Sequence, residues 1–195
     1  YKTAESTSEK IYIESNPNLA FLLPEAIQLF KNPRIVVVTR DIFSYIISAY
    51  NKSPDNSGNS FFYGENDRRK RLTLQDVKND VPISDWRNRN RFEKIAWYWN
   101  YCNNYIIRSL HNYPFYQVKF EDLFGDNRVS EMKKLSKYLG VYDHVRFGQK
   151  KDELSKKMNT NSFTLADNFE KLPVELRKNI AKSTENTRTM LGYNQ

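Results

Sequence analysis

One arginine stands where a strand and a helix are expected to meet. In the stretch RIVVVTRDIFSYIISAY, residues 34–50, an apolar run rich in β-branched residues ends at Thr39, and Arg40 follows it. Such a run is typical of a strand buried on both faces of a parallel sheet. A guanidinium can hold a phosphate or sulfate by two parallel hydrogen bonds, and a hydroxyl can add another. Arg40 is therefore our first candidate for an anion-binding residue.

The residues after Arg40 follow a helical period. One face is apolar and carries Phe43, Ile46, Ile47 and Tyr50, whereas the opposite face carries Asp41, Ser44 and Ser48. In open α/β sheets, ligands bind where a parallel strand gives way to a helix, and the free N–H groups of a helix N-terminus favour anions. Ser48 can thus share an anion with Arg40. The alternative is that Arg40 pairs with Asp41 or a neighbouring carboxylate and has only a structural role at the edge of the sheet.

The pattern as a whole predicts a single α/β domain over residues 1–195, with a parallel sheet flanked by helices. Strands are expected at Ile11–Ile13, Arg34–Thr39 and Phe115–Phe120. Helices are expected from Pro24 to Phe30, Asp41 to Tyr50, Phe92 to about His111, through Met132 to Leu139 with a stop at Gly140, and from Pro173 to Gly192.

Residues 51–90 depart from this alternation. Turn-forming residues fill 53–60, and the aromatic cluster Phe61, Phe62 and Tyr63 follows them. A long irregular segment on a compact domain is more often functional than idle, so we predict a substrate-facing insertion loop. The alternative is a surface loop whose aromatic residues fold back on the core.

Composition narrows the class of protein. The net charge of +8 favours anionic partners, but opposite charges alternate except at residues 68–71 and around 150–157, which makes nucleic-acid binding a minor alternative. A single cysteine, Cys102, forms no internal disulfide and favours a cytoplasmic location, whereas the alternative is an upstream segment that carries a membrane anchor or a signal. Two distant histidines do not suggest zinc. No apolar run reaches the roughly 20 residues that span a bilayer.

Several separated stretches together resemble the sulfotransferase superfamily, in particular its bacterial-type members. The first is RIVVVTRDIFSYIISAY, which resembles the family's 3′-phosphate motif of a strand, an Arg and a Ser eight positions later. The others, in chain order, are NPNLAFLLPEAIQLFKNPRIVVV, RFEKIAWYWNYCNNYIIRSL, YQVKFEDL, KKLSKYLGV and TRTMLGYNQ. Their order and spacing cover nearly the entire chain.

The resemblance implies a P-loop-NTPase-like sulfotransferase fold that transfers a sulfuryl group from PAPS to a small-molecule, sugar or peptide acceptor and leaves PAP. Arg40 and Ser48 would bind the 3′-phosphate. Phe120 falls where relatives place an aromatic residue near the adenine, although a core role fits it equally. Lys156 and Lys157 lie where relatives bring further cations, although solvated lysines are the common case.

Two features depart from the family pattern. Ile42 replaces the proline that often follows Arg-Asp, and the helical pattern survives this change. The glycine-rich loop that cradles the 5′-phosphosulfate belongs upstream of residues 11–13, and the six glycines of the chain form no such loop. Because the chain opens at Tyr1, we expect it to be the C-terminal portion of a longer protein, lacking the first strand, loop and helix. Otherwise the molecule could not activate the donor.

The resemblance also implies a general base near the strand that precedes the 3′-phosphate motif, where Glu14 is the ionisable candidate. Its alternative is a carboxylate that pairs with a lysine at the sheet edge. No metal is expected. Two other classes stay open: a P-loop nucleotide or sugar kinase, and a non-catalytic PAP-binding or nucleotide-binding domain. No motif names the acceptor or the oligomeric state.

Overall fold

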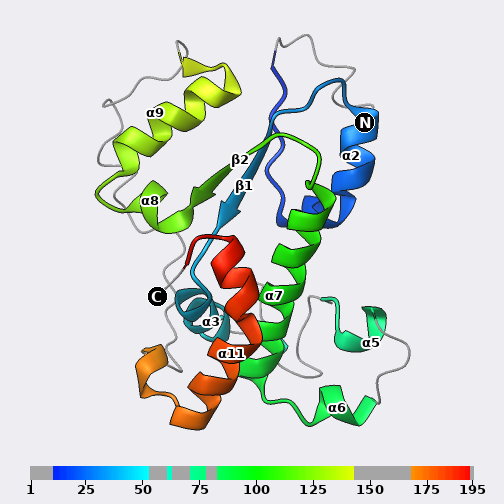
Figure 1. Ribbon diagram of the computed structural model, residues 1–195, viewed down its shortest axis with the longest axis vertical. Coiled ribbons are helices and arrows are strands. Elements are labelled where there is room, and N and C mark those ends of the chain that lie inside the picture. Colours follow the sequence, from blue (N-terminus) through cyan, green and yellow to red (C-terminus); the bar gives the residue numbers. More distant parts are fainter. Residues whose placement is uncertain (1–10, 53–60, 63–70, 78–82, 143–167, 194–195) are drawn as a thin grey trace.

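The computed structural model describes residues 11–52, 61–62, 71–77, 83–142 and 168–193 (Figure 1). Its sheet consists of two strands, β1 (Ile35–Thr39) and β2 (Phe115–Lys119), which pair in parallel from Ile35 opposite Phe115 to Thr39 opposite Lys119. The predicted α/β class, with a parallel sheet and flanking helices, is confirmed. The predicted strands at Arg34–Thr39 and Phe115–Phe120 are also correct to within a residue.

The prediction of a strand at Ile11–Ile13 is wrong. The three residues form no strand and are 45%, 45% and 62% exposed, respectively. A strand exists through hydrogen bonds to a neighbour, and the sheet of the described residues pairs β1 and β2 with each other alone. The chain instead passes into a 3-10 helix, η1 (Pro17–Leu22), and then α2 (Leu23–Leu29), with Pro24 in its first turn as expected.

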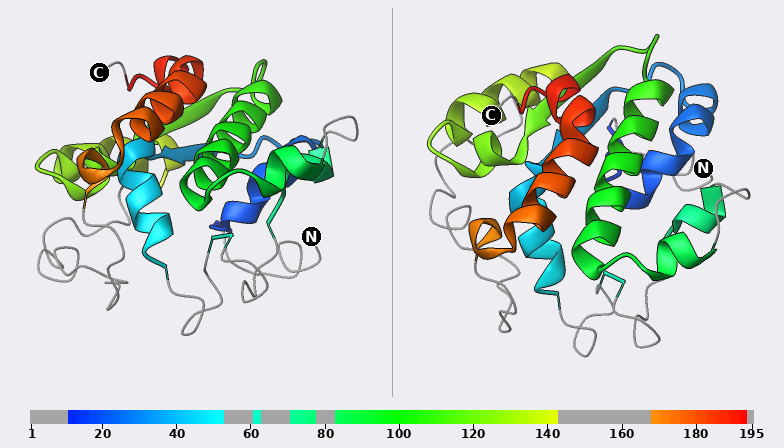
Figure 2. Two further views of the ribbon diagram at one scale, coloured as in Figure 1. Left: turned by 90° about the horizontal axis from the view of Figure 1, so that it is seen from below. Right: turned by 60° about the horizontal axis from the view of Figure 1, so that its bottom comes forward.

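Three helices build the core beside the sheet: α3 (Ile42–Tyr50), α7 (Arg91–Ser109) and α11 (Val174–Met190). Helices α7 and α11 lie side by side over one face of the sheet, and α3 packs against α7 (Figure 2). Their contact buries Ile42, Ile46, Ile95, Trp99 and Ile180 almost completely. At about 1.5–3 kcal/mol for each large apolar side chain, this burial stabilises the end of β1 that leads into α3.

Local signals define the ends of these helices. Asn90 and Glu93 form a reciprocal capping box at the start of α7. Helix α8 (Phe120–Phe124) follows β2 directly, and α9 (Arg128–Leu139) ends at Gly140, whose φ of 71° lies in the left-handed region that favours glycine. The predicted ends of the Gly140 helix and of the Pro173 helix are confirmed.

The described part of the 51–90 segment contains two short helices, α5 (Leu74–Val77) and α6 (Ile83–Arg87). Phe61 and Trp86 are each 9% exposed, and Phe62 packs against the core cluster. These aromatic side chains thus fold back on the core, which is the alternative to a substrate-facing role. Residues 53–60 and Tyr63 lie outside the described residues. In the described ranges, no helix has the length and apolar character needed to cross a membrane.

Candidate anion-binding site

Arg40 and Phe120 lie next to each other at the carboxyl edge of the sheet. Thr39 and Lys119 form the last register pair of the parallel strands, so the residues that follow them leave the sheet side by side. The Arg40 guanidinium carbon lies 4.6 Å from the centroid of the Phe120 ring. This cation–π contact covers one face of the guanidinium without using any of its N–H groups.

Two further contacts fix Arg40. Its Nε donates to Ser44 Oγ at 3.1 Å, one helical turn into α3. Its carbonyl oxygen accepts a hydrogen bond from Trp99 Nε1 at 3.0 Å, which ties the junction to α7. Among the described residues, Nη1 and Nη2 of Arg40 have no hydrogen-bond partner and no carboxylate forms an ion pair with Arg40. The described structure therefore does not contain the pairing of Arg40 with Asp41 that was the alternative.

The N-terminus of α3 is occupied by carboxylates. Asp41 caps the helix, with its Oδ2 accepting from the Ser44 N–H at 2.9 Å. The Asp41 N–H in turn donates to Glu121 Oε1 at 3.0 Å. Two backbone donors expected to attract an anion are thus already used by the protein. An anion at this edge would depend on side chains more than on the helix terminus.

Arg40 and Ser48 line one pocket of about 450 Å³, within the size range of small-ligand sites. The other lining residues are Phe43, Ser44, Ile47, Asn168, Phe169 and Glu170. Helix α3 and the 3-10 helix η4 (Phe169–Lys171) provide its walls. Glu170, its one acidic lining residue, forms an ion pair with Arg177, which reduces repulsion of an anion.

Ser44 and Asn168 also line this pocket, and neither was predicted as a site residue. Ser44 stands four positions after Arg40, and this helical spacing predicts contact between their side chains. Asn168 comes from a distant part of the chain, where its Oδ1 accepts from the Glu170 N–H at 3.0 Å. Nothing in the local sequence around Asn168 indicates that it returns to α3.

The C-terminal Leu-Gly-Tyr segment closes the same edge of the sheet. Tyr193 Oη donates to Glu121 Oε2 at 3.0 Å and lies 3.3 Å from Thr39 Oγ1. Lys119 Nζ donates to the Gly192 carbonyl oxygen at 2.6 Å. Burial raises the pKa of the Tyr193 phenol above its ordinary value, and the Glu121 carboxylate raises it further. Separated motifs at residues 39–40, 119–121 and 192–193 therefore meet at one place.

The other predicted site residues are not brought into the pocket. Glu14 is exposed and accepts a hydrogen bond from Tyr12 Oη at 2.9 Å, and it is not among the residues that line the pocket. Lys156 and Lys157 lie outside the described residues. Across the ranges that the structure describes, no group of three or more His, Cys, Asp or Glu side chains is arranged to hold a metal ion.

Searches against protein-family models, curated proteins and solved structures find no match to this chain.

Proposed function

We propose that this chain is a PAPS-dependent sulfotransferase of P-loop-NTPase-like fold, in which Arg40 and Ser48 bind the 3′-phosphate of PAPS and PAP. One observation carries the proposal. Arg40 at the carboxyl edge of β1 and Ser48 two turns into α3 line the same pocket. These are the two residues that the family resemblance assigns to the 3′-phosphate.

The chemistry of the pocket suits this ligand. Since Ser44 engages Nε of Arg40, the terminal nitrogens provide the two parallel donors that a phosphate accepts. Ser48 adds a neutral hydroxyl from the same helix. Phe43 and Ile47 form an apolar wall, and the Phe120 ring restrains the guanidinium. A fixed guanidinium loses less conformational entropy on binding than a mobile one.

In the proposed reaction, an acceptor hydroxyl or amine attacks the sulfur of PAPS in line. The bond from sulfur to the 5′-phosphate oxygen breaks, a new bond from sulfur to the acceptor forms, and PAP leaves. A general base takes the acceptor proton. Arg40 and Ser48 are the residues proposed to bind the 3′-phosphate. Glu14 does not line this pocket, so its role as the general base stays a hypothesis that rests on the family resemblance.

Calorimetric titration of PAP and of AMP, which lacks the 3′-phosphate, tests this proposal on the wild type and on Arg40→Ala. A charge-assisted hydrogen bond contributes about 1.5–3 kcal/mol, so Arg40→Ala should weaken PAP binding about tenfold or more. AMP should bind weakly to both proteins. Arg108→Ala is the matched control, because it removes an exposed arginine of α7 that does not line the pocket.

Equal affinity for PAP and AMP would contradict a 3′-phosphate site and favour a kinase-type nucleotide site. PAP binding that depends on Arg40, without sulfuryl transfer to any acceptor, would favour the non-catalytic PAP-binding domain. No binding of PAP to the wild-type chain would overturn the proposal for residues 1–195.

A further inference from the structure

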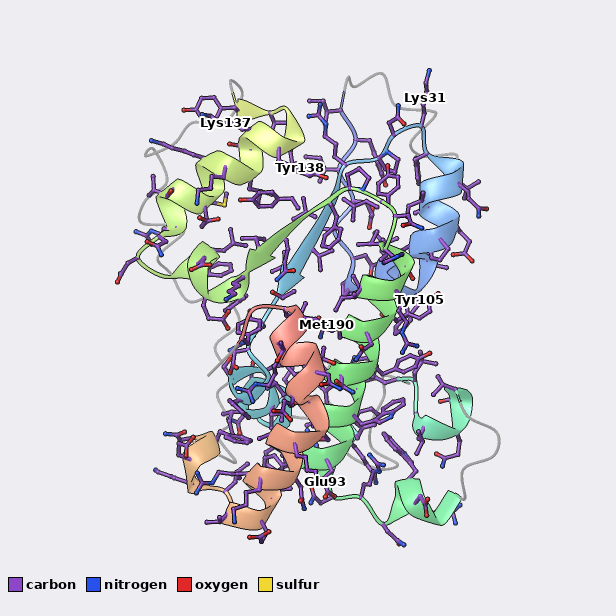
Figure 3. The ribbon with its side chains drawn as sticks, in the orientation of Figure 1. Lys31, Glu93, Tyr105, Lys137, Tyr138 and Met190 are labelled. Carbon is purple, nitrogen blue, oxygen red and sulfur yellow. The ribbon has the colours of Figure 1, made fainter. Side chains whose placement is uncertain are left out.

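A second pocket of about 450 Å³ lies in the groove between α7 and α11. It lies where the N-terminal parts of the two helices run side by side, near Glu93 (Figure 3). Its lining residues are Arg89, Glu93, Ala96, Trp97, Asn100, Asn179, Ile180 and Ser183, none of which lines the Arg40 pocket. It is therefore a separate site, and its interpretation does not rest on the proposed sulfotransferase activity.

The pocket has an apolar floor, and one aromatic residue, Trp97, is part of its lining. Ala96 and Ile180 are 2% and 1% exposed, respectively, and form part of the main core, so the floor is fixed. The half-buried Trp97 ring stacks on Tyr101 at 5.3 Å between centroids and meets the edge of Trp86 at 5.1 Å. Tyr101 covers one face of the indole, and both neighbours hold it in place, so the part of Trp97 that lines the groove is rigid.

The polar lining consists mainly of amides and a hydroxyl. Asn100 Oδ1 accepts hydrogen bonds from Thr187 and from Asn104, and Thr187 is 1% exposed. This buried network fixes the Asn100 amide, whose NH₂ group has no partner among the described residues. Opposite it, α11 contributes the exposed side chains of Asn179 and Ser183. The groove thus presents hydrogen-bonding groups from both helices.

The charges of the lining cancel. Arg89 is its one cation and Glu93 its one anion, and Glu93 Oε2 already accepts from the Asn90 N–H at 2.9 Å. A balanced site gives no general attraction to phosphate or sulfate. The Arg40 pocket also has one cation and one anion in its lining, but there Glu170 is paired with Arg177, whereas Glu93 forms no ion pair among the described residues. The charge of Glu93 therefore stays available to offset that of Arg89, which favours a neutral ligand that has many hydroxyl groups.

We propose that the groove between α7 and α11 binds a neutral saccharide. A pyranose has an apolar face of C–H groups that can pack on the Trp97 indole, while its hydroxyls both donate and accept hydrogen bonds. The amides of Asn100 and Asn179 supply complementary donors and acceptors, and Ser183 Oγ, which donates to the Ile180 carbonyl oxygen at 3.1 Å, supplies a further acceptor. A nucleobase could also stack on Trp97, but it would present fewer hydroxyl groups to the two asparagines and the serine.

Tryptophan fluorescence and saturation-transfer NMR with maltose, cellobiose, lactose and N,N′-diacetylchitobiose test this proposal, with adenosine as the competing ligand. Each sugar is titrated to about 10 mM, which detects sites of millimolar affinity. At least one disaccharide should bind saturably. Asn179→Ala and Ser183→Ala should each weaken it about threefold to tenfold, because each removes a neutral hydrogen bond.

Both variants change exposed side chains of α11, so the fold should survive, and thermal unfolding checks this. Lys182→Ala is the matched control, since Lys182 is exposed on the same helix and does not line the groove. The proposal is overturned if no disaccharide binds, if binding is unchanged in Asn179→Ala and Ser183→Ala, or if adenosine binds in the groove and the sugars do not.

Discussion

At the scale of single residues, the candidate anion site depends on how Arg40 is held. Its Nε bonds to Ser44 and its face covers the Phe120 ring, and these contacts leave the terminal nitrogens for a ligand. Ser44 Oγ itself donates to the Asp41 carbonyl oxygen at 3.1 Å, which fixes the hydroxyl. Ser44 therefore acts as a positioning residue for Arg40.

Ser44→Ala should weaken PAP binding about threefold to tenfold, because Arg40 loses the neutral hydrogen bond that orients it. Ser44→Thr keeps a hydroxyl and should restore most of the affinity. The measurement is PAP titration by calorimetry, with thermal unfolding to compare the stability of the three proteins. If Ser44→Ala and Ser44→Thr bind PAP equally well, the orienting role is wrong.

At the scale of elements, helix α7 supports the candidate anion site through a hydrogen bond from Trp99 to Arg40. Trp99 is 3% exposed, and its indole N–H is the group that holds the Arg40 carbonyl oxygen. A strand-to-helix junction has no ladder hydrogen bonds of its own, so this contact helps to define the direction in which the chain leaves β1. The tryptophan thus connects the core to the candidate site.

Trp99→Phe keeps most of the buried apolar surface but removes the indole N–H, which leaves a carbonyl oxygen of the junction unsatisfied. We expect a loss of about 1–3 kcal/mol in the free energy of unfolding, and weaker PAP binding. Urea unfolding and PAP calorimetry measure the two effects. Trp86→Phe is the control, because Trp86 is also buried but does not contact Arg40. Unchanged PAP affinity in Trp99→Phe would show that the hydrogen bond from Trp99 to the Arg40 carbonyl oxygen does not affect the anion site.

Periodicity predicted the main helices and the parallel pair of strands, but it did not predict their packing in detail. In α3 the apolar face was expected at Phe43, Ile46, Ile47 and Tyr50, whereas the most buried residues are Ile42, Ile46 and Ala49. Ala49 is 2% exposed as a member of the core cluster, and the sequence of α3 alone does not indicate that this small residue is buried. Phe43 and Ile47 are partly buried against the core cluster and also line the pocket.

The candidate anion site likewise combines residues that local sequence features place with residues that only tertiary packing places. Arg40 and Ser48 could be predicted because a strand end and one helix face place them, and both are local features. Asn168 and Tyr193 reach the same edge only through tertiary packing. The expectation for Ile11–Ile13 failed because a short apolar run becomes a strand only beside a partner.

At the scale of the whole molecule, three phenols and one thiol are partly buried. Burial raises the pKa of Tyr98 to about 12 and that of the Cys102 thiol, from 9.0, to about 12. Burial also raises the pKa of Tyr45 and Tyr193 above the ordinary value of 10.0. All four groups are neutral when protonated, so the folded state favours the protonated forms.

The free energy of unfolding should therefore be independent of these groups below about pH 9 and fall as the pH rises above it. Above that pH, the unfolded chain releases protons that the folded chain still holds, and this release stabilises the unfolded state relative to the folded state. Cys102→Ala should remove the part of the decline that begins near the ordinary thiol pKa of 9.0 and leave the tyrosine part that begins near 10.0. Urea unfolding of both proteins from about pH 8 to pH 11 measures this. Identical pH dependence in the wild type and Cys102→Ala would show that the folded state does not hold the thiol proton more tightly.

The raised pKa of the Cys102 thiol also predicts slow reaction with thiol reagents at pH 8 until urea unfolds the chain, because the thiolate is the reactive form.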